Sequence, residues 1–238
     1  MHALSARIAG QFAPRGEGEV CAVFKRSFYL RFPENNYACV GDESIGRGPL
    51  NAIVDDFAAP ALGEKIALSA DRTWQPARST GRFDVAALRE AARDRVPAEG
   101  LGCLVAGTHN ALSAHAQPAL DAIDEWLAGN ALDSRAEQLI GLGPGLTPSG
   151  DDYFGGVMVA LHLRGRASHA ASLRRWLEPR LASRTSAISA AHLAAAASGE
   201  AHEALHNVLD GNLDLDSLDA VGHCSGWDAL AGAVAVLR

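Results

Sequence analysis

The sequence predicts an α+β protein in which residues 1–80 form a β-rich part and residues 81–238 form a mainly helical part. Two observations indicate this division. Apolar and polar residues alternate in the first part, as in half-buried strands, whereas the second part is rich in alanine and spaces its apolar residues at helical intervals. Because no Ser- or Gly-rich linker separates the two parts, we expect them to pack together as one compact unit.

The β-rich part is expected to be a small antiparallel sheet or a barrel. From Val20 to Phe32 the even positions are apolar, and only Arg26 interrupts them, so this segment predicts strand structure with one buried face. Shorter strands are expected at residues 37–40, 50–54, 65–68 and 73–75, bounded by Gly, Pro and Asp.

The helical part is expected to open with a helix over residues 84–96. A second helix is expected to start at Pro118, and a short third one at Ser134, which forms a capping box with Glu137. Residues 101–106 fit either a strand or a buried helix. Proline interrupts a helix interior, so Pro179 is expected to break the second helix of the next group. These later helices are expected at residues 152–163, 169–177, 186–197, 201–209, 215–221 and 227–237.

The composition is that of a globular protein, with 48% hydrophobic and 21% charged residues. A net charge of −7 argues against binding to nucleic acid or to an anionic membrane, because both need a basic surface. No stretch approaches the roughly 20 apolar residues of a membrane span, and residues 1–15 lack an apolar signal segment. The four cysteines are scattered without a Cys-X-X-Cys pair, so we expect reduced thiols and a cytoplasmic location.

Residues 141–152 read Gly-Leu-Gly-Pro-Gly-Leu-Thr-Pro-Ser-Gly-Asp-Asp and form the most informative segment of the chain. Its glycines give a permissive backbone that leads into a helix N-terminus. Free N–H groups and the helix dipole favour an anion at such a place. The carboxylates could instead hold a metal, or the segment could simply cap the helix. The candidate substrate-binding residues here are Gly143, Gly145, Thr147, Ser149 and Gly150.

A weaker copy of this motif follows 76 residues later, because residues 225–232 repeat the pattern Ser-Gly-X-Asp-X-apolar-X-Gly of residues 149–156. Serine favours the N-cap and the aspartate can bond back to it, so one interpretation is two capped helices. The other is two equivalent helix starts at one site, with Gly156 and Gly232 in close helix packing. We predict the second arrangement, in which Ser225 and Asp228 join the site.

Asp151 and Asp152 are the central candidates for catalysis. Consecutive helical side chains diverge by about 100°, so the two carboxylates are expected to have different roles. Asp228 matches Asp152 in the copy, whereas Trp227 stands at the position of Asp151. We therefore expect a structural, capping role for Asp152 and a ligand or metal contact for Asp151.

Two further segments supply candidate residues. Arg184, Thr185 and Ser186 open a predicted helix, and a guanidinium with hydroxyls at a helix N-terminus suits a carboxylate or phosphate. His223 is a candidate catalytic residue that could bind an oxyanion or transfer a proton, or it is a hydrogen-bonded loop histidine. No His-Glu-X-X-His or P-loop pattern is present, so cofactor and metal stay unknown.

The Gly-rich run at residues 141–152 resembles the signature of a bacterial family of domains of unknown function that includes the AllH subunit of oxamate carbamoyltransferase. Residues 184–189 with His192 and Leu193, residues 222–232 and, more faintly, residues 48–51 are also similar to that family. The resemblance implies carbamoyl transfer between carbamoyl phosphate and oxamate in allantoin breakdown, with partner subunits or a homo-oligomer. Both substrates are small anions, which agrees with the donors in the Gly-rich run.

Two other functions stay open. The chain could be a non-catalytic subunit that binds a small anion or supports assembly. It could also be a metal-dependent hydrolase that uses Asp151, Asp152 and Asp228 as ligands. Turnover by the isolated chain would separate an enzyme from a subunit, and metal analysis would test the hydrolase.

Overall fold

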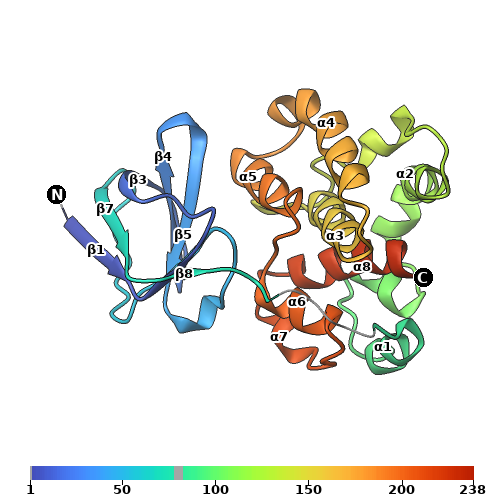
Figure 1. Ribbon diagram of the computed structural model, residues 1–238, viewed down its shortest axis with the longest axis horizontal. Helices are drawn as coiled ribbons and strands as arrows, with labels where there is room; N and C mark the ends of the chain where they lie inside the picture. Colours follow the sequence, from blue (N-terminus) through green and yellow to red (C-terminus); the bar gives the residue numbers. More distant parts are fainter. Residues whose placement is uncertain (1, 78–82) are drawn as a thin grey trace. The chain divides into compact units, whose positions relative to one another are not determined.

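The structure, a computed structural model, describes residues 2–77 and 83–238 and confirms the α+β class (Figure 1). The boundary expected between residues 80 and 81 lies outside the described residues. The chain forms two compact units. The β-rich unit contains residues 2–77 together with residues 200–203, and the helical unit contains residues 83–199 and 204–238.

Within residues 2–77 the β-rich unit has one eight-stranded sheet in the order β1-β7-β3-β4-β5-β6-β2-β8. Three pairings are parallel, namely β1 with β7, β5 with β6 and β2 with β8, so the sheet is mixed and not purely antiparallel. Its strands are β1 (His2–Ala6), β2 (Ile8–Gly10), β3 (Gly16–Val23), β4 (Ser27–Phe32), β5 (Asn36–Gly41), β6 (Asn51–Ile53), β7 (Lys65–Ala70) and β8 (Thr73–Trp74).

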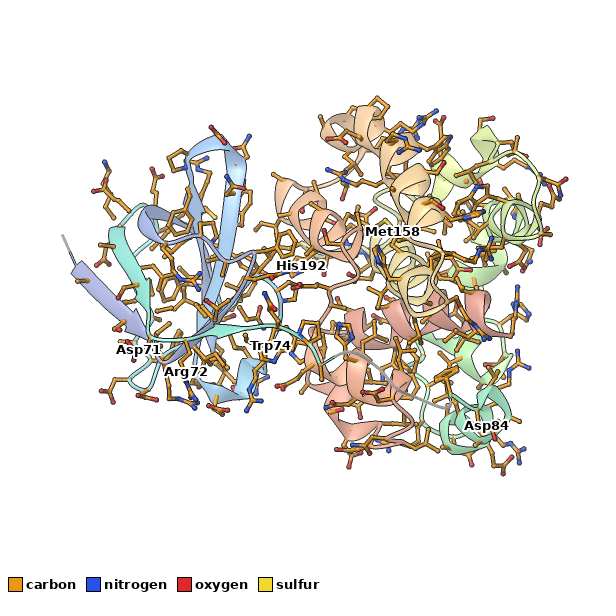
Figure 2. The ribbon with its side chains drawn as sticks, in the orientation of Figure 1. Asp71, Arg72, Trp74, Asp84, Met158 and His192 are labelled. Carbon is orange, nitrogen blue, oxygen red and sulfur yellow. The ribbon has the colours of Figure 1, made fainter. Side chains whose placement is uncertain are left out.

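The sheet is curled into a half-barrel. β1 and β2 are separated only by Arg7, yet they lie near opposite ends of the strand order. β7 and β8 make the same switch through Asp71 and Arg72, which Figure 2 labels. The Asp71 N–H donates to Ala6 O at 2.9 Å, and the Ala9 N–H donates to Arg72 O at 3.0 Å. The two ends of the sheet therefore meet at these switches, and one face of the curl forms the core of the unit.

The period-two segment from Val20 to Phe32 is a hairpin of two strands. Val20 pairs with Leu30, and the chain turns at Arg26, where the apolar alternation breaks. Val20, Phe28, Leu30 and Phe32 lie in the same core, with Val20 and Phe28 each 1% exposed. The register shifts between Val20 and Ala22, and Phe24 is 46% exposed, so the alternation does not hold through the turn. The sequence did not predict β1 and β2, because small residues such as Ala6 and Ala9 carry little apolar signal although both are buried.

The helical unit is built around α3, a central helix whose Met158 is fully buried and points into the surrounding helices (Figure 2). Of residues 101–106, which fitted either a strand or a buried helix, residues 102–106 form a 3₁₀ helix and Leu101 is its N-cap. The α-helices are α1 (Val85–Ala92), α2 (Ala111–Leu127), α3 (Ser149–Leu163), α4 (Ala167–Arg184), α5 (Ala187–Ala196), α6 (Glu203–Leu209), α7 (Asp216–Asp219) and α8 (Ser225–Leu237), and the 3₁₀ helices here are η3 (Gly102–Ala106) and η4 (Ser134–Leu139).

The predictions based on proline were wrong in both places. Pro118 lies inside α2, which begins earlier behind an Asn110 capping box, and Pro179 lies inside α4. A proline removes one helical hydrogen bond, but packing on both sides of it can keep the helix intact. Leu177 and Leu181 flank Pro179 and are both buried, which supplies that packing. The cap of η4 is Asp133 instead of Ser134.

Candidate functional site

Helices α3 and α8 pack against each other more extensively than any other pair of described elements, and Figure 1 shows α8 crossing α3. Their contact is reciprocal. A Cβ atom on Gly156 would lie 1.7 Å from Ala229 O, and one on Gly232 would lie 1.9 Å from Tyr153 O. Since Tyr153 and Ala229 are equivalent in the repeated motif, each helix makes the same contact on the other. The two copies are thus related by a local twofold arrangement.

The duplication also includes the segment before each helix. In the first copy the Leu142 N–H donates to Leu139 O, and the Gly150 N–H donates to Leu142 O. In the second copy the same two bonds run from Val221 to Leu218 and from Gly226 to Val221. The offset between the copies is 79 residues at Leu139 and 76 at Ser149, so the first loop is three residues longer. Each copy is therefore one helix–loop–helix element.

The two helix starts meet through hydroxyl and carboxyl groups. Thr147 Oγ1 lies 3.0 Å from Ser225 Oγ. Burial raises the pKa of Asp152 and of Asp228, and the hydroxyl of Ser225 opposes the rise at Asp152 as that of Ser149 does at Asp228. Each serine therefore serves the aspartate of the other copy. This crosswise pairing brings both starts to one place, as predicted.

Neither serine caps its own helix, so that part of the interpretation was wrong. The N-cap positions are Pro148 and Cys224, and neither makes a side-chain cap hydrogen bond. Ser149 and Ser225 are the first helical residues, one position too late to act as the cap. The aspartates are consequently free to bond outside their own helices.

Asp228 is a buried clamp, by which we mean a carboxylate that accepts backbone N–H groups of another segment and so holds it in place. It is 1% exposed, and its Oδ1 accepts the N–H groups of Leu101 at 2.5 Å and Gly102 at 3.0 Å. Burial raises the pKa of Asp228 to about 6, although these hydrogen bonds oppose the rise. Gly100 permits this approach, because a Cβ there would lie 2.5 Å from Asp228 Oδ1. The carboxylate therefore fastens the segment before η3 to the start of α8.

Asp151 is also a buried clamp, at 1% exposure. Its Oδ1 accepts the Gly141 N–H at 2.9 Å, and its Oδ2 accepts the hydroxyls of Ser189, at 2.7 Å, and Thr185. Burial raises the pKa of Asp151, and these three hydrogen bonds oppose the rise. The carboxylate joins the Gly-rich loop, α3 and the start of α5. The expected ligand contact is instead a set of internal bonds.

Asp152 differs from both clamps. The residue is only half-buried, and its Oδ2 oxygen is buried without a hydrogen-bond partner among the described residues. Burial raises the pKa of Asp152 well above its usual value, and the nearby charges of Asp228 and Asp151 add to the rise. Among the described residues, no backbone N–H donates to the Asp152 carboxyl as that of Leu101 donates to Asp228. Asp151, expected to contact a ligand, is thus held by internal hydrogen bonds, whereas Asp152, expected to act as a cap, keeps one oxygen without a partner among the described residues.

The Gly-rich loop is shaped by positive φ and anchored by α5. Gly143 has φ +108° and Gly145 has φ +98°, and the space around Gly145 is open. The Ser186 hydroxyl donates to Leu146 O at 2.5 Å and also accepts the Ser189 N–H as the cap of α5. The predicted start of this helix at Ser186 is therefore confirmed, and its hydroxyl holds the loop.

The two candidate basic residues, Arg184 and His223, each contact a glutamate side chain. The Arg184 guanidinium pairs with Glu137 Oε2 at 2.7 Å, and Arg180 binds the same carboxylate. His223 is exposed, and its Nε2 lies 2.9 Å from Glu99 Oε2. Burial raises the pKa of the Cys224 thiol to about 11, so it stays protonated at neutral pH.

Sequence reasoning missed the N–H groups of Leu101 and Gly102, because a backbone donor leaves no side-chain signature. The only available signal was the Gly-Leu-Gly run at residues 100–102. Among residues 2–77 and 83–238, no group of three or more His, Cys, Asp or Glu side chains is arranged to hold a metal ion. Asp151, Asp152 and Asp228 therefore do not form the carboxylate metal site considered above.

These observations define the chain as an α+β protein whose helical unit holds two copies of one helix–loop–helix element, with one unclamped carboxyl where the copies meet. The family model for the oxamate carbamoyltransferase subunit AllH matches residues 139–237. The matched segment begins at Leu139 of the first copy and ends with α8, so the resemblance is confirmed over both copies. Residues 48–51 lie outside it.

Comparisons with curated proteins and with solved structures gave no match. In the part of the chain that the structure describes, no helix is long and apolar enough to cross a membrane.

Proposed function

We propose that this chain is a subunit of an oxamate carbamoyltransferase that acts on carbamoyl phosphate and oxamate together with partner subunits or further copies of itself. The observation that carries the proposal is the family match, which spans both helix–loop–helix copies and the three aspartates where they meet, although not Leu101 and Gly102. Cys21, Cys39, Cys103 and Cys224 are free thiols, which supports a cytoplasmic setting for such an enzyme.

Carbamoyl transfer requires a proton acceptor. The amide nitrogen of oxamate attacks the carbamoyl carbon, the bond from that carbon to the phosphate oxygen breaks, and phosphate departs with the electron pair. The nitrogen loses one proton in this step. We assign that proton to Asp152, because its half-buried carboxyl has one oxygen, Oδ2, without a hydrogen-bond partner among the described residues.

The remaining site residues position this carboxyl and the substrates. Asp151, Thr185 and Ser186 hold the loop, and Asp228 with Ser149 holds the start of α8. The backbone N–H groups around Gly143, Gly145 and Gly150, with the hydroxyls of Thr147 and Ser225, are proposed to bind the anionic groups. Arg184 and His223 would join them only by leaving Glu137 and Glu99.

A non-catalytic subunit is the second candidate. Asp151 and Asp228 are buried and committed to internal bonds, as in a structural element that shapes an interface. In that case the chain would bind a small anion or support assembly while a partner subunit performs the reaction.

Turnover separates these two functions. The chain is assayed for phosphate release from carbamoyl phosphate with oxamate, alone and with its copurifying partner subunits, and Asp152→Asn is compared in the same assembly. A loss of about 100-fold or more in kcat, with unchanged assembly, supports the catalytic role. Full activity of Asp152→Asn supports the non-catalytic subunit, and no transfer under any condition rejects the proposed reaction.

A further inference from the structure

The second copy of the helix–loop–helix element shows what kind of group its aspartate binds. Asp228 and Asp152 are equivalent, with equivalent serines, glycines and preceding turns. At Asp228 the carboxylate is occupied by two N–H donors of the chain itself, from Leu101 and Gly102. At Asp152 no described backbone group takes that place, and Oδ2 is left without a partner.

We propose that Asp152 binds the N–H groups of the primary amide of the substrate oxamate, in the way that Asp228 binds two peptide N–H groups. This inference rests on the proposed function and names the part of the substrate that the site recognises. A carboxylate accepts N–H donors and repels the oxygens of a phosphate or a second carboxylate. Asp152 therefore recognises the NH2 end, and the anionic end lies toward the loop.

The two copies differ where such a ligand would enter. The first loop has three extra residues and carries Thr147, whose hydroxyl lies at Asp152 and Ser225. Ser186 holds the neighbouring Leu146 carbonyl, while Gly145 borders open space. The longer loop thus belongs to the copy whose carboxyl has an unpartnered oxygen, and the shorter loop belongs to the copy whose carboxyl is bound by Leu101 and Gly102.

Binding of N–H donors has a measurable consequence for protons. Donors stabilise the ionised carboxylate, so ligand binding lowers the pKa of Asp152 and releases a proton to the buffer. The groups that face it are Asp151 on α3 and Asp228 with the Cys224 thiol at α8, and His223 acts on Asp228 from the loop. Asp151 and Asp228 keep their internal partners, so the released proton is assigned to Asp152.

The test compares oxamate with oxalate, which has a carboxylate in place of the amide. Calorimetry in buffers of different ionisation enthalpy gives the affinity and the protons released for the wild type and for Asp152→Asn. Asp121→Asn, an exposed aspartate on α2, controls for the loss of one charge. The wild type and Asp121→Asn should bind oxamate at least about ten-fold more tightly than oxalate, with proton release. Asp152→Asn should lose both the preference and the release.

The outcomes test amide binding by Asp152 separately from the proposed carbamoyl transfer. Carbamoyl transfer together with equal affinity for the two ligands would keep the proposed function and overturn the role of Asp152. Preference for oxamate through Asp152 without any transfer would keep the amide site and reject the reaction. If neither the chain nor its assembly with partner subunits binds oxamate at millimolar concentration, the inference is wrong.

Discussion

Three aspartates of the same type carry out different tasks because their neighbours differ. Asp151 and Asp228 are each 1% exposed and are satisfied by donors from other elements, whereas Asp152 is half-buried with one oxygen unpartnered. Burial raises the pKa of all three. Backbone N–H donors oppose the rise at Asp151 and Asp228, whereas no described backbone donor does so at Asp152. At the scale of single residues, the hydrogen-bond donors around each carboxyl therefore distinguish the role of Asp152 from those of Asp151 and Asp228.

Replacing Asp151 and Asp152 by asparagine should give opposite results. Asp151→Asn places an NH2 group against the hydroxyl donors of Thr185 and Ser189 and should lower the free energy of unfolding by about 1–3 kcal/mol. Asp152→Asn should change stability by less than about 1 kcal/mol but should weaken oxamate binding. Denaturant unfolding and calorimetry measure the two effects. A stable Asp151→Asn that fails to bind would restore the roles predicted from sequence.

The raised pKa of Asp228 predicts a dependence of stability on pH. Its ordinary value near 3.8 rises to about 6 in the folded state, so folding favours the protonated form. The stability associated with this group is complete below about pH 4 and falls as pH rises to about 6, by about 3 kcal/mol. Asp228→Asn removes this fall, and it also removes the repulsion on Asp152.

Unfolding curves of the wild type and Asp228→Asn from pH 4 to 8 test this prediction. Between pH 4 and 7, the unfolding free energy of Asp228→Asn should rise by about 3 kcal/mol relative to that of the wild type. A difference that stays constant across that range would show that burial does not penalise the ionised carboxylate.

At the scale of elements, the helical unit contains two copies of one helix–loop–helix element, and the two copies differ in detail. Gly156 and Gly232 keep the backbones of α3 and α8 close, and each helix start serves the other. The position before the shared aspartate ties down the preceding turn in both copies. Asp151 does so by accepting the Gly141 N–H, and Trp227 does so by donating to Asp219 Oδ1 at 2.7 Å.

Two neighbouring glycines of α3 should respond in opposite ways to alanine. In Gly156→Ala the new Cβ meets Ala229 O at 1.7 Å, so the helices must separate, at a net cost of about 2 kcal/mol or more. In Gly155→Ala the new Cβ lies 3.7 Å from Ala196 Cβ, an ordinary contact. That control should be neutral or gain up to about 1 kcal/mol from helix propensity. Thermal unfolding compares the pair, and equal stability would contradict the close packing.

Sequence patterns predicted the elements that carry strong periodicity and missed those that depend on partners. The alternation around Val20 identified strands, and the repeated Ser-Gly-X-Asp motif identified two meeting helices. The predictions that Pro118 starts a helix and that Pro179 breaks one were wrong, because tertiary packing keeps both helices intact around a proline. The roles of Asp151 and Asp152 depend on Gly141, Thr185 and Ser189, which approach only after folding. Such contacts leave no local sequence signal.

At the scale of the whole molecule, a segment from the C-terminal half belongs to the β-rich unit. Residues 200–203 are part of that unit, where Glu203 Oε1 accepts the Arg47 N–H at 2.7 Å. His202 Nε2 lies 2.9 Å from Ile45 O, beside Gly46, and burial lowers the pKa of this histidine. The half-barrel is therefore completed by residues that are distant in sequence.

Glu203→Ala should loosen this part of the β-rich unit. The Arg47 N–H loses its acceptor, so we expect a loss of about 1–2 kcal/mol and faster amide exchange at Arg47 and along β6. Glu178→Ala removes an exposed ion pair with Arg174 on α4 and should cost less than about 1 kcal/mol. Hydrogen exchange followed by mass spectrometry reads both variants, and unchanged exchange at β6 in Glu203→Ala would argue against this completion.

The central claim is that Asp152 is the working carboxyl of a site formed by two copies of one element. A crystal structure of the chain, with its partner subunits if the assembly requires them, soaked with carbamoyl phosphate and oxamate tests it most directly. The claim predicts a ligand NH2 group within hydrogen-bond distance of Asp152, with Asp151 and Asp228 keeping their internal bonds. Ligand density elsewhere, or ligand donors bound to Asp151 while Asp152 caps its own helix, would contradict it.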